Sequence, residues 1–330
     1  MSKSRYSERL RAGLIGLATC VTAAACLAAE PVRFIALGDQ PYGQDSRTGP
    51  AYRHLIELIN AERLRFAIHV GDIKDGLTDC TDALYARQIA HFGSYSSAVV
   101  YTPGDNDWAD CQRQTADPIE RLAALRRVYF GTPQSLGQRP LPLQRQSALM
   151  PAHAAFAENQ RWWYERVLFA TFHTVGPSDN VEDPSAALRQ EQRAREAANI
   201  AWIRDAFTLA RERGARALVL ATQADVVQRG PTRADPLQVA KAFVPTFAET
   251  LVPLAKVAPF PVLLIHGDSH RLITDRPFSD ATGRRVDNLW RLQVPGESRM
   301  HAVRVSVEPG RAAPFSFDLI WNPMSPDPDR

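Results

Sequence analysis

The feature that most constrains this chain is a short apolar run that passes directly into a polar turn, a pattern repeated five times. Each run is rich in Val, Ile, Leu and Ala and is about four to six residues long, which is typical of a strand buried on both faces. The runs are Val32–Leu37, Phe66–Val70, Ala98–Pro103, Ala217–Ala221 and Val262–Ile265. Strands of this kind, separated by helical patterns, predict an α/β fold.

Four of the five turns contain the pair Gly-Asp, and this repetition predicts where the chemistry lies. The pairs are 38–39, 71–72, 104–105 and 267–268, while the remaining turn carries Gln223. Glycine lets the backbone turn sharply where a strand ends, and the carboxyl ends of strands in an open α/β sheet line one crevice. Carboxylates gathered in one crevice repel each other unless a cation balances them. The pattern therefore predicts a divalent metal site with oxygen and nitrogen ligands.

The rest of the chain alternates between helical and extended patterns. Helices are expected at Pro50–Arg63, Thr81–Phe92, Asp117–Tyr129, Pro184–Arg213 and Pro236–Val257. Further strands are expected within Trp162–Val175 and, as a closing antiparallel set, at Leu289–Val294, His301–Val307 and Phe315–Trp321. The segment Gly131–Asn159 is rich in Pro, Gln and Ser and is expected to be a surface excursion.

The N-terminal segment 1–29 has the three parts of a secretory signal peptide. A basic region runs to Arg11, an apolar stretch covers Ala12–Leu27, and small residues precede Glu30. The apolar stretch is shorter than the roughly 20 residues that a membrane helix needs, so we expect an exported protein, periplasmic or secreted, without a stable membrane anchor. An uncleaved anchor and lipidation at Cys20 are the alternatives. Residues 30–322 are expected to form a single domain, followed by a C-terminal tail at 323–330.

The charge balance argues against nucleic acid as a partner. The chain has 39 Lys and Arg against 36 Asp and Glu, a formal net charge of +3. The segment 1–29 carries four of the basic and one of the acidic side chains, which leaves 35 of each in the mature chain. A neutral chain has no basic excess to attract DNA or an acidic membrane surface. The oligomeric state has no signature in the sequence.

Two cysteines remain after the expected signal peptide, Cys80 and Cys111. An even pair in an exported chain predicts one disulfide, here closing a loop of about 30 residues beside the second and third polar turns. Two buried free thiols are the alternative.

The order of these motifs resembles the calcineurin-like metallophosphoesterases, with some features similar to the purple acid phosphatase branch. The family pattern is Asp-X-His, Gly-Asp, Gly-Asn-His-Asp/Glu, a lone His and Gly-His-X-His, and the resemblance covers about residues 32–275. It implies a four-layer α/β/β/α sandwich with a mixed central sheet pair and a pair of divalent metal ions. It also implies that a metal-bound hydroxide hydrolyses a phosphate mono- or diester, and that the substrate is a small phosphorylated molecule.

The resemblance assigns metal ligands residue by residue. Asp39 and His270 would bind the first ion, and Asp72 would bridge both ions. The second ion would take Asn106 and Asp268, together with Gln223 at the place of the lone His. Because the second set contains only oxygen ligands, Mg²⁺, Mn²⁺ or Ca²⁺ would suit it better than Zn²⁺, and Fe is a further candidate.

Several positions depart from the family pattern. Pro41 replaces the His of Asp-X-His, and Asp268 replaces the first His of Gly-His-X-His. Asp75 lies three residues after the bridging Asp, where the purple acid phosphatase branch has a Tyr ligand, and is therefore a further candidate metal ligand. Asp107 replaces the His that protonates the leaving group, which makes it, with Asn106, a candidate catalytic residue. An unshifted carboxyl pKa of about 4 would leave Asp107 ionised at neutral pH, so an acid role requires a raised pKa.

Three arginines and one histidine complete the candidates. Arg47, Arg113 and Arg271 are each placed to contact a phosphate, and the sequence does not choose among them. His266 is expected either to orient a metal ligand from behind the site or to be an ordinary buried histidine. The missing histidines also support a second hypothesis, a catalytically degenerate, non-enzymatic envelope protein that keeps the fold and binds a ligand.

Overall fold

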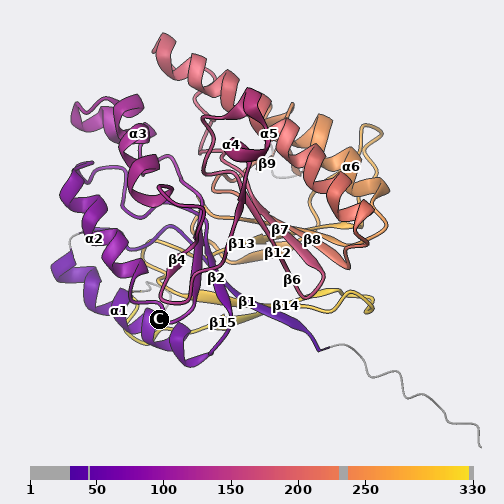
Figure 1. Cartoon of the computed structure of the whole chain (residues 1–330), viewed down its shortest axis with the longest axis horizontal. Helices are drawn as coiled ribbons and strands as arrows, with labels where there is room; N and C mark the ends of the chain where they lie inside the picture. The colour runs from indigo at the N-terminus through magenta and orange to yellow at the C-terminus, as the bar shows by residue number, and fades with distance from the viewer. Residues whose placement is uncertain (1–29, 44, 230–236, 327–330) are drawn as a thin grey trace, which may run out of the picture. The chain divides into compact units, whose positions relative to one another are not determined.

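The computed structural model describes residues 30–43, 45–229 and 237–326. The signal peptide expected at residues 1–29 and the end of the expected tail lie outside these ranges. From Pro31 onward the chain forms a unit of its own, in which two β-sheets stack between two layers of helices (Figure 1). The expected four-layer α/β/β/α sandwich with two mixed sheets is confirmed. Among the described residues, no helix is both long and apolar enough to cross a bilayer.

The first sheet has the strand order β15-β14-β1-β2-β3-β4. Its parallel centre consists of β1 (Val32–Leu37), β2 (Phe66–His69) and β3 (Ala98–Tyr101). The antiparallel strands β14 (Ala302–Val307) and β15 (Phe315–Ile320) extend one side, and the short β4 (Leu136–Gly137) pairs with β3 on the other. Apolar residues of this sheet pack against the helices α1 (Asp45–Ala61), α2 (Asp82–Phe92) and α3 (Pro118–Tyr129), drawn in indigo to magenta in Figure 1.

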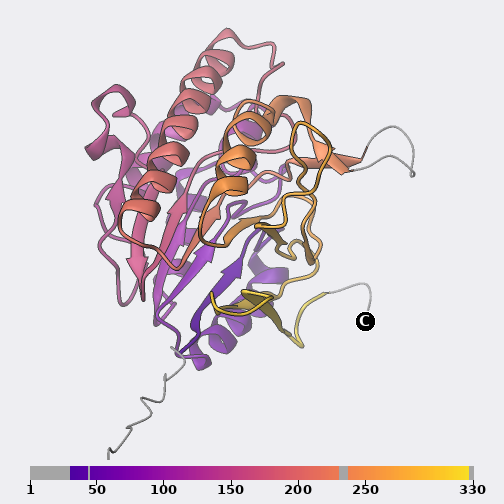
Figure 2. The same cartoon turned by 90° about the vertical axis from the view of Figure 1, so that its right-hand side faces the viewer.

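The second sheet has the strand order β12-β13-β11-β8-β7-β6-β5. Its parallel strands are β7 (Val167–Thr171), β8 (Ala217–Ala221), β11 (Val262–His266) and β13 (Leu289–Gln293). The strands β5 (Gln144–Arg145), β6 (Gln160–Tyr164) and β12 (Ile273–Asp275) are antiparallel to their neighbours. The long helix α5 (Ala186–Glu212) and the short α6 (Val252–Val257) cover its outer face, as Figure 2 shows.

The two sheets face each other across an aromatic and aliphatic core. Alternate residues of β1, β2 and β3 point between the sheets and meet alternate residues of β7, β8 and β11. Phe34 and Phe66 stack with ring centroids 5.4 Å apart, and Trp162 stacks on Phe169 at 5.2 Å. Because helices cover the other face of each sheet, both faces of these strands are buried, which explains their nearly continuous apolar runs.

Helix starts follow the capping signals in the sequence. Thr81, Asp117 and Ser185 each accept a hydrogen bond from a backbone N–H in the first turn of α2, α3 and α5 respectively. Pro118 occupies the first turn of α3, where a missing N–H costs nothing.

The expected helix Pro236–Val257 was wrong in its first part. From residue 237 the chain forms β10 (Leu237–Val239), which pairs with β9 (Val227–Arg229), then a 3₁₀ turn at Lys241–Phe243, a π-helical turn at Phe247–Leu251 and finally α6. Pro245 lacks the N–H that a continuous helix would need, so helical spacing of apolar residues was not sufficient here.

Two other expectations need correction. The segment Gly131–Asn159 is not wholly a surface excursion, because Asn159 donates to Gln146 at 2.8 Å and Gln146 donates to the Ala198 carbonyl at 2.7 Å inside the fold. It also contains β4, β5, a short helix at Gln146–Leu149 and a 3₁₀ turn at Pro151–His153. The last strands are split between the sheets, since β13 runs parallel to β11 whereas β14 and β15 are antiparallel.

Candidate functional site

The turns that follow the parallel strands of the two sheets meet in one place. The amide of Asp39, after β1, donates to the carbonyl of Gly71, after β2. The amide of Asp268, after β11, donates to Asp39 Oδ1 at 2.9 Å. The side chain of Gln223, after β8, donates to Asp72 Oδ2 at 3.0 Å. The crevice expected at the carboxyl ends of the strands is therefore shared by both sheets.

The backbone at this meeting point is strained and closely packed. Asp39, Asp72 and Asp268 have φ values of 54°, 55° and 74°, in the left-handed region that non-glycine residues rarely adopt. A Cβ on Gly104 would lie 2.0 Å from Asp72 Oδ1, and one on Gly267 would lie 2.0 Å from Asp39 Oδ2. Glycine at these two positions is required because the carboxylates occupy the space of a side chain.

Asp72 is the centre of the hydrogen-bond network. Its Oδ2 accepts from the Tyr42 hydroxyl at 3.0 Å, from Asn106 Nδ2 at 3.0 Å and from Gln223 Nε2 at 3.0 Å, and its Oδ1 accepts from the Asn106 amide at 3.1 Å. The Gln223 amide is held in this orientation because its Oε1 accepts from the Gly176 N–H at 2.8 Å. Every one of these donors is neutral, so the negative charge of Asp72 has no opposite charge among them.

His270 lies between two carboxylates, those of Asp39 and Glu297. Asp39 Oδ2 is buried and has no hydrogen-bond partner. His270 Nε2 lies 3.8 Å from Asp39 Oδ1, and its Nδ1 lies 3.2 Å from Glu297 Oε2. A carboxylate on the far nitrogen of a histidine is the usual arrangement behind a metal-ligating imidazole. Glu297 was missed by sequence reasoning, because it lies in a late loop outside every motif.

Asp105 is a further carboxylate that sequence reasoning missed. It is 7% exposed, and its Oδ1 has no hydrogen-bond partner. Counting the family pattern Gly-Asn-His-Asp/Glu from Gly104 places Asp105 at the Asn and Asn106 at the His, so the signal was available in the sequence. We call Asp39, Asp72, Asp105 and Asp268 the acid cluster.

The members of the acid cluster raise one another's pKa. Burial, together with the charges of the other members, raises the pKa of Asp39, Asp72 and Asp105 well above the usual range, although the Asp268 N–H opposes the shift at Asp39. Burial likewise raises the pKa of Asp268 to about 6, although the backbone N–H of Asp225 opposes this shift. Such carboxylates become neutral by taking up protons or by binding cations.

The acid cluster fits a divalent cation by its chemistry. It offers two unpartnered buried carboxylate oxygens and an oriented imidazole, whereas Asn106 turns its amide N–H rather than its oxygen toward Asp72. In the part of the chain that the structure describes, no group of three or more His, Cys, Asp or Glu side chains is arranged so that it could hold an ion. The fit therefore rests on the donor set and its uncompensated charge.

Asp107 is placed in the interior beneath the acid cluster. It is fully buried, and its two oxygens accept from the amides of Asp72, Ile73 and Gly104 and from the Tyr101 hydroxyl at 2.6–3.0 Å. Burial raises its pKa, while these hydrogen bonds oppose the shift. Asp107 thereby holds the turns after β2 and β3 together, a task that differs from the acid role suggested by the sequence.

Asp75 is also saturated by hydrogen bonds. Its carboxylate accepts from the amides of Gly43, Leu77 and Thr78 and from the Thr78 hydroxyl, all at 2.8–2.9 Å. Burial alone would raise its pKa, but these donors lower it. Asp75 thus organises the loop after β2, and its oxygens are used there rather than at the acid cluster.

His266 lies behind the site and reaches it only indirectly. Its Nδ1 is 3.0 Å from the Gly267 carbonyl oxygen, and its buried Nε2 has no hydrogen-bond partner and lies 3.9 Å from Asp225 Oδ1. Asp225 in turn donates its N–H to Asp268 Oδ2 at 3.0 Å.

The expected disulfide is present between Cys80 and Cys111, with Cα atoms 5.7 Å apart. Cys80 lies in the loop after β2, and Cys111 lies in the 3₁₀ helix Ala109–Gln114 after β3. The bond therefore joins the two loops that carry Asp72 and Asp105.

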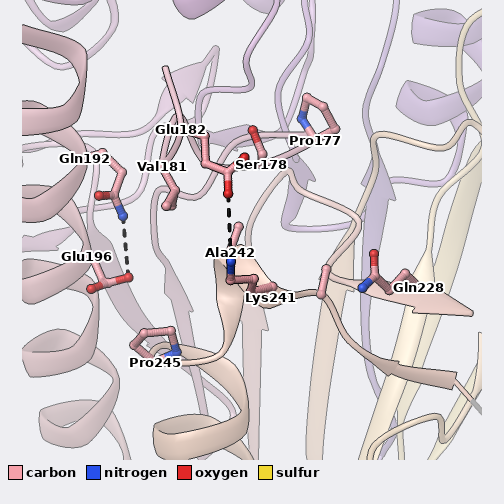
Figure 3. A pocket seen from close by; sticks show the side chains of 11 residues that line it. Pro177, Ser178, Val181, Glu182, Gln192, Glu196, Gln228, Lys241, Ala242 and Pro245 are labelled. Carbon is pink, nitrogen blue, oxygen red and sulfur yellow. Dashed lines mark hydrogen bonds and ion pairs between the residues drawn. The ribbon is translucent and has the colours of Figure 1, made fainter. Parts of the chain in front are cut away.

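A pocket of about 420 Å³, shown in Figure 3, is lined in part by Pro177, the residue that follows Gly176. Its walls are mainly prolines, alanines and uncharged amides, and Gln192 hydrogen-bonds Glu196 across one side at 3.4 Å. Lys241 and Glu182, which also line it, lie 4.0 Å apart. Its mixed, largely uncharged lining contrasts with the acid cluster.

Comparison with known proteins shows similarity of structure only. No family model and no curated protein matches the sequence. The solved structure of PhoD superposes with a TM-score of 0.54 at 15% identity, covering 84% of this chain and 64% of that protein. The purple acid phosphatase PPD1 from yellow lupin (Lupinus luteus) gives 0.41 at 12% identity over 88% of this chain and 54% of its own. TT1561 of Thermus thermophilus gives 0.43 at 9% identity over 88% and 100%.

This chain thus spans about two thirds of PhoD, the one structure of these three with a TM-score above 0.5. At such low identity the likeness concerns the arrangement of sheets and helices, not the chemistry of the site. The chain has the calcineurin-like metallophosphoesterase fold, as a divergent example of it.

Proposed function

We propose that the chain is an exported phosphoesterase that requires divalent cations and hydrolyses a mono- or diester of phosphoric acid. The observation that carries this proposal is the acid cluster, in which Asp39, Asp72 and Asp105 are buried and Asp268 is partly buried. These four carboxylates come from both sheets and have no cationic side chain among their hydrogen-bond partners. Such a concentration of like charge at a strand-end crevice is costly unless protons or bound cations neutralise it, and divalent cations would do so at neutral pH.

Residues of this chain would hold the cations in two groups. Asp39 and His270 form one group, with Glu297 orienting the imidazole. Asp105 and Asp268 would form the other, and Asp72 would be shared by the two groups. Divalent ions bound there would make water a nucleophile near neutral pH and offset charge on the phosphoryl group.

The remaining polar side chains would position the ligands. Tyr42 and Asn106 both contact Asp72 Oδ2, and Asn106 Nδ2 also donates to the Tyr42 hydroxyl at 2.8 Å. Their side-chain donors are therefore used within the network, where they would orient the Asp72 carboxylate toward the cations. Asp107 would hold the turns that carry the ligands in place, because it accepts hydrogen bonds from the amides of Asp72 and Gly104.

Export is supported by two independent features. The sequence of segment 1–29 has the pattern of a signal peptide, and Cys80 and Cys111 are joined in a disulfide. Disulfides persist in oxidising compartments and are rare in the cytosol.

A second candidate function is a non-enzymatic binding protein. The observation that favours it is Gln223, whose amide is turned by Gly176 so that its N–H, rather than its oxygen, faces Asp72. A fixed donor at this position replaces a metal ligand and would weaken catalysis.

One experiment separates the two functions. The mature chain is incubated with Mn²⁺, Mg²⁺, Ca²⁺ or Zn²⁺ and with p-nitrophenyl phosphate or its bis-ester between pH 4 and 9. We expect metal-dependent turnover that is abolished by EDTA and by Asp72→Asn but not by Asp287→Asn, a change at an exposed carboxylate. Metal binding without turnover under any condition would instead support the binding protein.

A further inference from the structure

Arg113 lies at the edge of the acid cluster and is held there by a carboxylate. It belongs to the 3₁₀ helix Ala109–Gln114, two residues after the disulfide at Cys111. Its Nη1 lies 2.6 Å from Asp110 Oδ2, and 53% of its side chain is exposed. The guanidinium is therefore fixed on one side and open to solvent on the other.

The atoms that surround Gly76 show that Arg113 lies close to Asn106 and so to the acid cluster. A Cβ added to Gly76 would lie 2.7 Å from Arg113 Nη1, 2.8 Å from Asn106 Oδ1 and 2.9 Å from Asp110 Oδ2. Atoms that lie this close to one common point are themselves near neighbours, so the guanidinium is close to the Asn106 amide. Asn106 in turn donates to Asp72 Oδ2. A single side chain, Asn106, thus separates the guanidinium from the centre of the acid cluster.

The other nearby cation is not available to a ligand. Lys74 is 1% exposed, and its Nζ donates to the Asp75 carbonyl at 3.0 Å. Burial raises the pKa of Asp110, whereas the charges of Arg113 and Lys74 oppose that rise. Asp110 is therefore placed between a buried cation and an exposed one, and of these two only Arg113 faces solvent.

The chemistry of guanidinium suits this location. Arginine presents several N–H donors in a planar fork that matches two oxygens of a phosphoryl group. An exposed ion pair such as Arg113–Asp110 contributes little to stability. Its role is better explained if Asp110 orients the guanidinium of Arg113. Gly76 keeps the approach open, because any side chain there would collide with all three atoms.

We propose that Arg113 is a substrate-binding residue that holds the phosphoryl oxygens of a phosphate ester beside Asn106, with Asp110 as its positioning residue. The inference rests on the proposed phosphoesterase function and assigns the phosphate contact that the sequence left open among Arg47, Arg113 and Arg271. Because it concerns recognition of the phosphoryl group, binding of inorganic phosphate tests it without requiring turnover.

The test compares wild type, Arg113→Ala and Arg113→Lys, all loaded with Mn²⁺. Arg127→Ala serves as the control, because Arg127 is an exposed arginine paired with Glu120 on α3. We measure the Kd of inorganic phosphate by calorimetry, KM and kcat for p-nitrophenyl phosphate, and bound Mn²⁺. Loss of charge-assisted hydrogen bonds predicts that Arg113→Ala raises both Kd and KM roughly ten- to a hundredfold. Arg113→Lys should lie between, and bound Mn²⁺ should not change.

A second variant tests the geometry rather than the charge. Gly76→Ala adds one methyl group against Arg113, Asn106 and Asp110 and should weaken phosphate binding in the same direction. A change of less than twofold in phosphate Kd for Arg113→Ala, with Mn²⁺ content intact, would overturn the inference, as would a wild type that does not bind phosphate. Arginine-dependent phosphate binding without hydrolysis would uphold it and reject the phosphoesterase activity.

Discussion

The chain buries two clusters of charged side chains, and they are balanced in opposite ways. In the acid cluster, the hydrogen-bond donors to Asp72 are a hydroxyl and amides. In a second cluster, which we call the paired cluster, Glu158 accepts from Arg126 and contacts His173, while Asp179 accepts from the fully buried Arg195. Burial is similar in the two clusters, so the difference lies in the presence of arginine.

The pKa of Glu158 differs from those of the acid cluster in the expected direction, whereas burial keeps the pKa of Asp179 raised although Arg195 opposes the shift. Burial opposes ionisation of Glu158, but Arg126 and His173 lower its pKa well below the usual range. In the acid cluster, burial and the neighbouring like charges both raise the pKa values of Asp39 and Asp72. A carboxylate that has its cation within the fold belongs to the structure, whereas one that lacks it becomes neutral by binding a proton or a cation from solution.

The paired cluster nevertheless supports the site. Trp108, two residues after Asn106, donates its indole N–H to His173 Nε2 at 3.1 Å, and Glu158 lies 3.0 Å from the other nitrogen of His173. The paired cluster thus anchors the loop after β3, which carries part of the acid cluster.

The largest effect is expected from Asp72→Asn. The substitution keeps the shape of the side chain and removes the charge shared by the two proposed groups of ligands. We expect loss of at least one equivalent of bound metal and of nearly all hydrolysis, with the fold retained. Metal analysis and turnover, measured beside wild type and beside Asp75→Asn, check this. Asp75→Asn should have the smaller effect, because its oxygens are used within its own loop.

In the metal-free protein the same variant should lose little stability, because relief of an uncompensated buried charge offsets the acceptor that the Asn amide removes from the network. Thermal unfolding in EDTA measures this. A metal-free Asp72→Asn protein that unfolds well below wild type would mean that the charge of Asp72 is balanced within the fold.

Breaking the paired cluster should affect stability instead of metal binding. Glu158→Gln leaves Arg126 and His173 without their carboxylate. Removing one partner of a buried ion pair costs roughly 3 kcal/mol of the free energy of unfolding. Urea denaturation and metal content of the folded variant provide the two readings. If Glu158→Gln lost metal while keeping its stability, the distinction between the clusters would fail.

Removing the disulfide should have an effect on stability of similar size. Cys80 and Cys111 are separated by 31 positions, and closing a loop of this length contributes roughly 4 kcal/mol in the loop-entropy model. The double variant Cys80→Ser/Cys111→Ser should therefore unfold at lower urea concentration. Two titratable thiols in the denatured, unreduced wild type would show that the bond does not form.

The smallest predicted effect is a dependence of stability on pH that differs between the clusters. The native pKa of Asp268 is raised from 3.8 to about 6, chiefly by burial. Between these values Asp268 binds more protons in the native state than in the unfolded state, so its contribution to the stability of the metal-free protein should fall as pH rises through this window. Glu158 acts in the opposite direction, because its lowered pKa contributes stability that is lost as pH falls below about 4.5.

Melting temperatures in EDTA at pH 5 and pH 7 test this prediction, and Asp268→Asn is the matched variant. The lowered pKa values of His69 and His266, about 4, add stability as pH rises, but they do so in both proteins. We therefore expect the stability of Asp268→Asn relative to wild type to increase from pH 5 to pH 7, and Mn²⁺ to restore wild type at pH 7. A difference between the two proteins that stays constant from pH 5 to pH 7 would contradict the raised pKa of Asp268.

Much of the fold could be predicted because its signals are local. The strands Val32–Leu37 and Ala217–Ala221 have in the structure the bounds that the sequence predicts, and Thr81 and Asp117 cap the helices that they are expected to begin. The chain around Pro245 could not be predicted in this way, because helical spacing of apolar residues says nothing about a missing N–H.

The site could be predicted only where one motif supplies the side chain. The turns after β1, β2, β8 and β11 are expected from the sequence to meet, and they do. The partners of Asp107 could not be predicted, because its hydrogen bonds join turns that are far apart in sequence. Glu297 was missed for the same reason, since only the folded chain brings it to His270.

The most direct test of the central claim is equilibrium dialysis of the metal-free mature protein against Mn²⁺, with bound metal measured per chain. If the acid cluster is a cation site, wild type and Glu158→Gln should each bind at least one equivalent, and Asp72→Asn should bind less than either. Wild type that binds no metal, or Asp72→Asn that binds as much as wild type, would contradict the account.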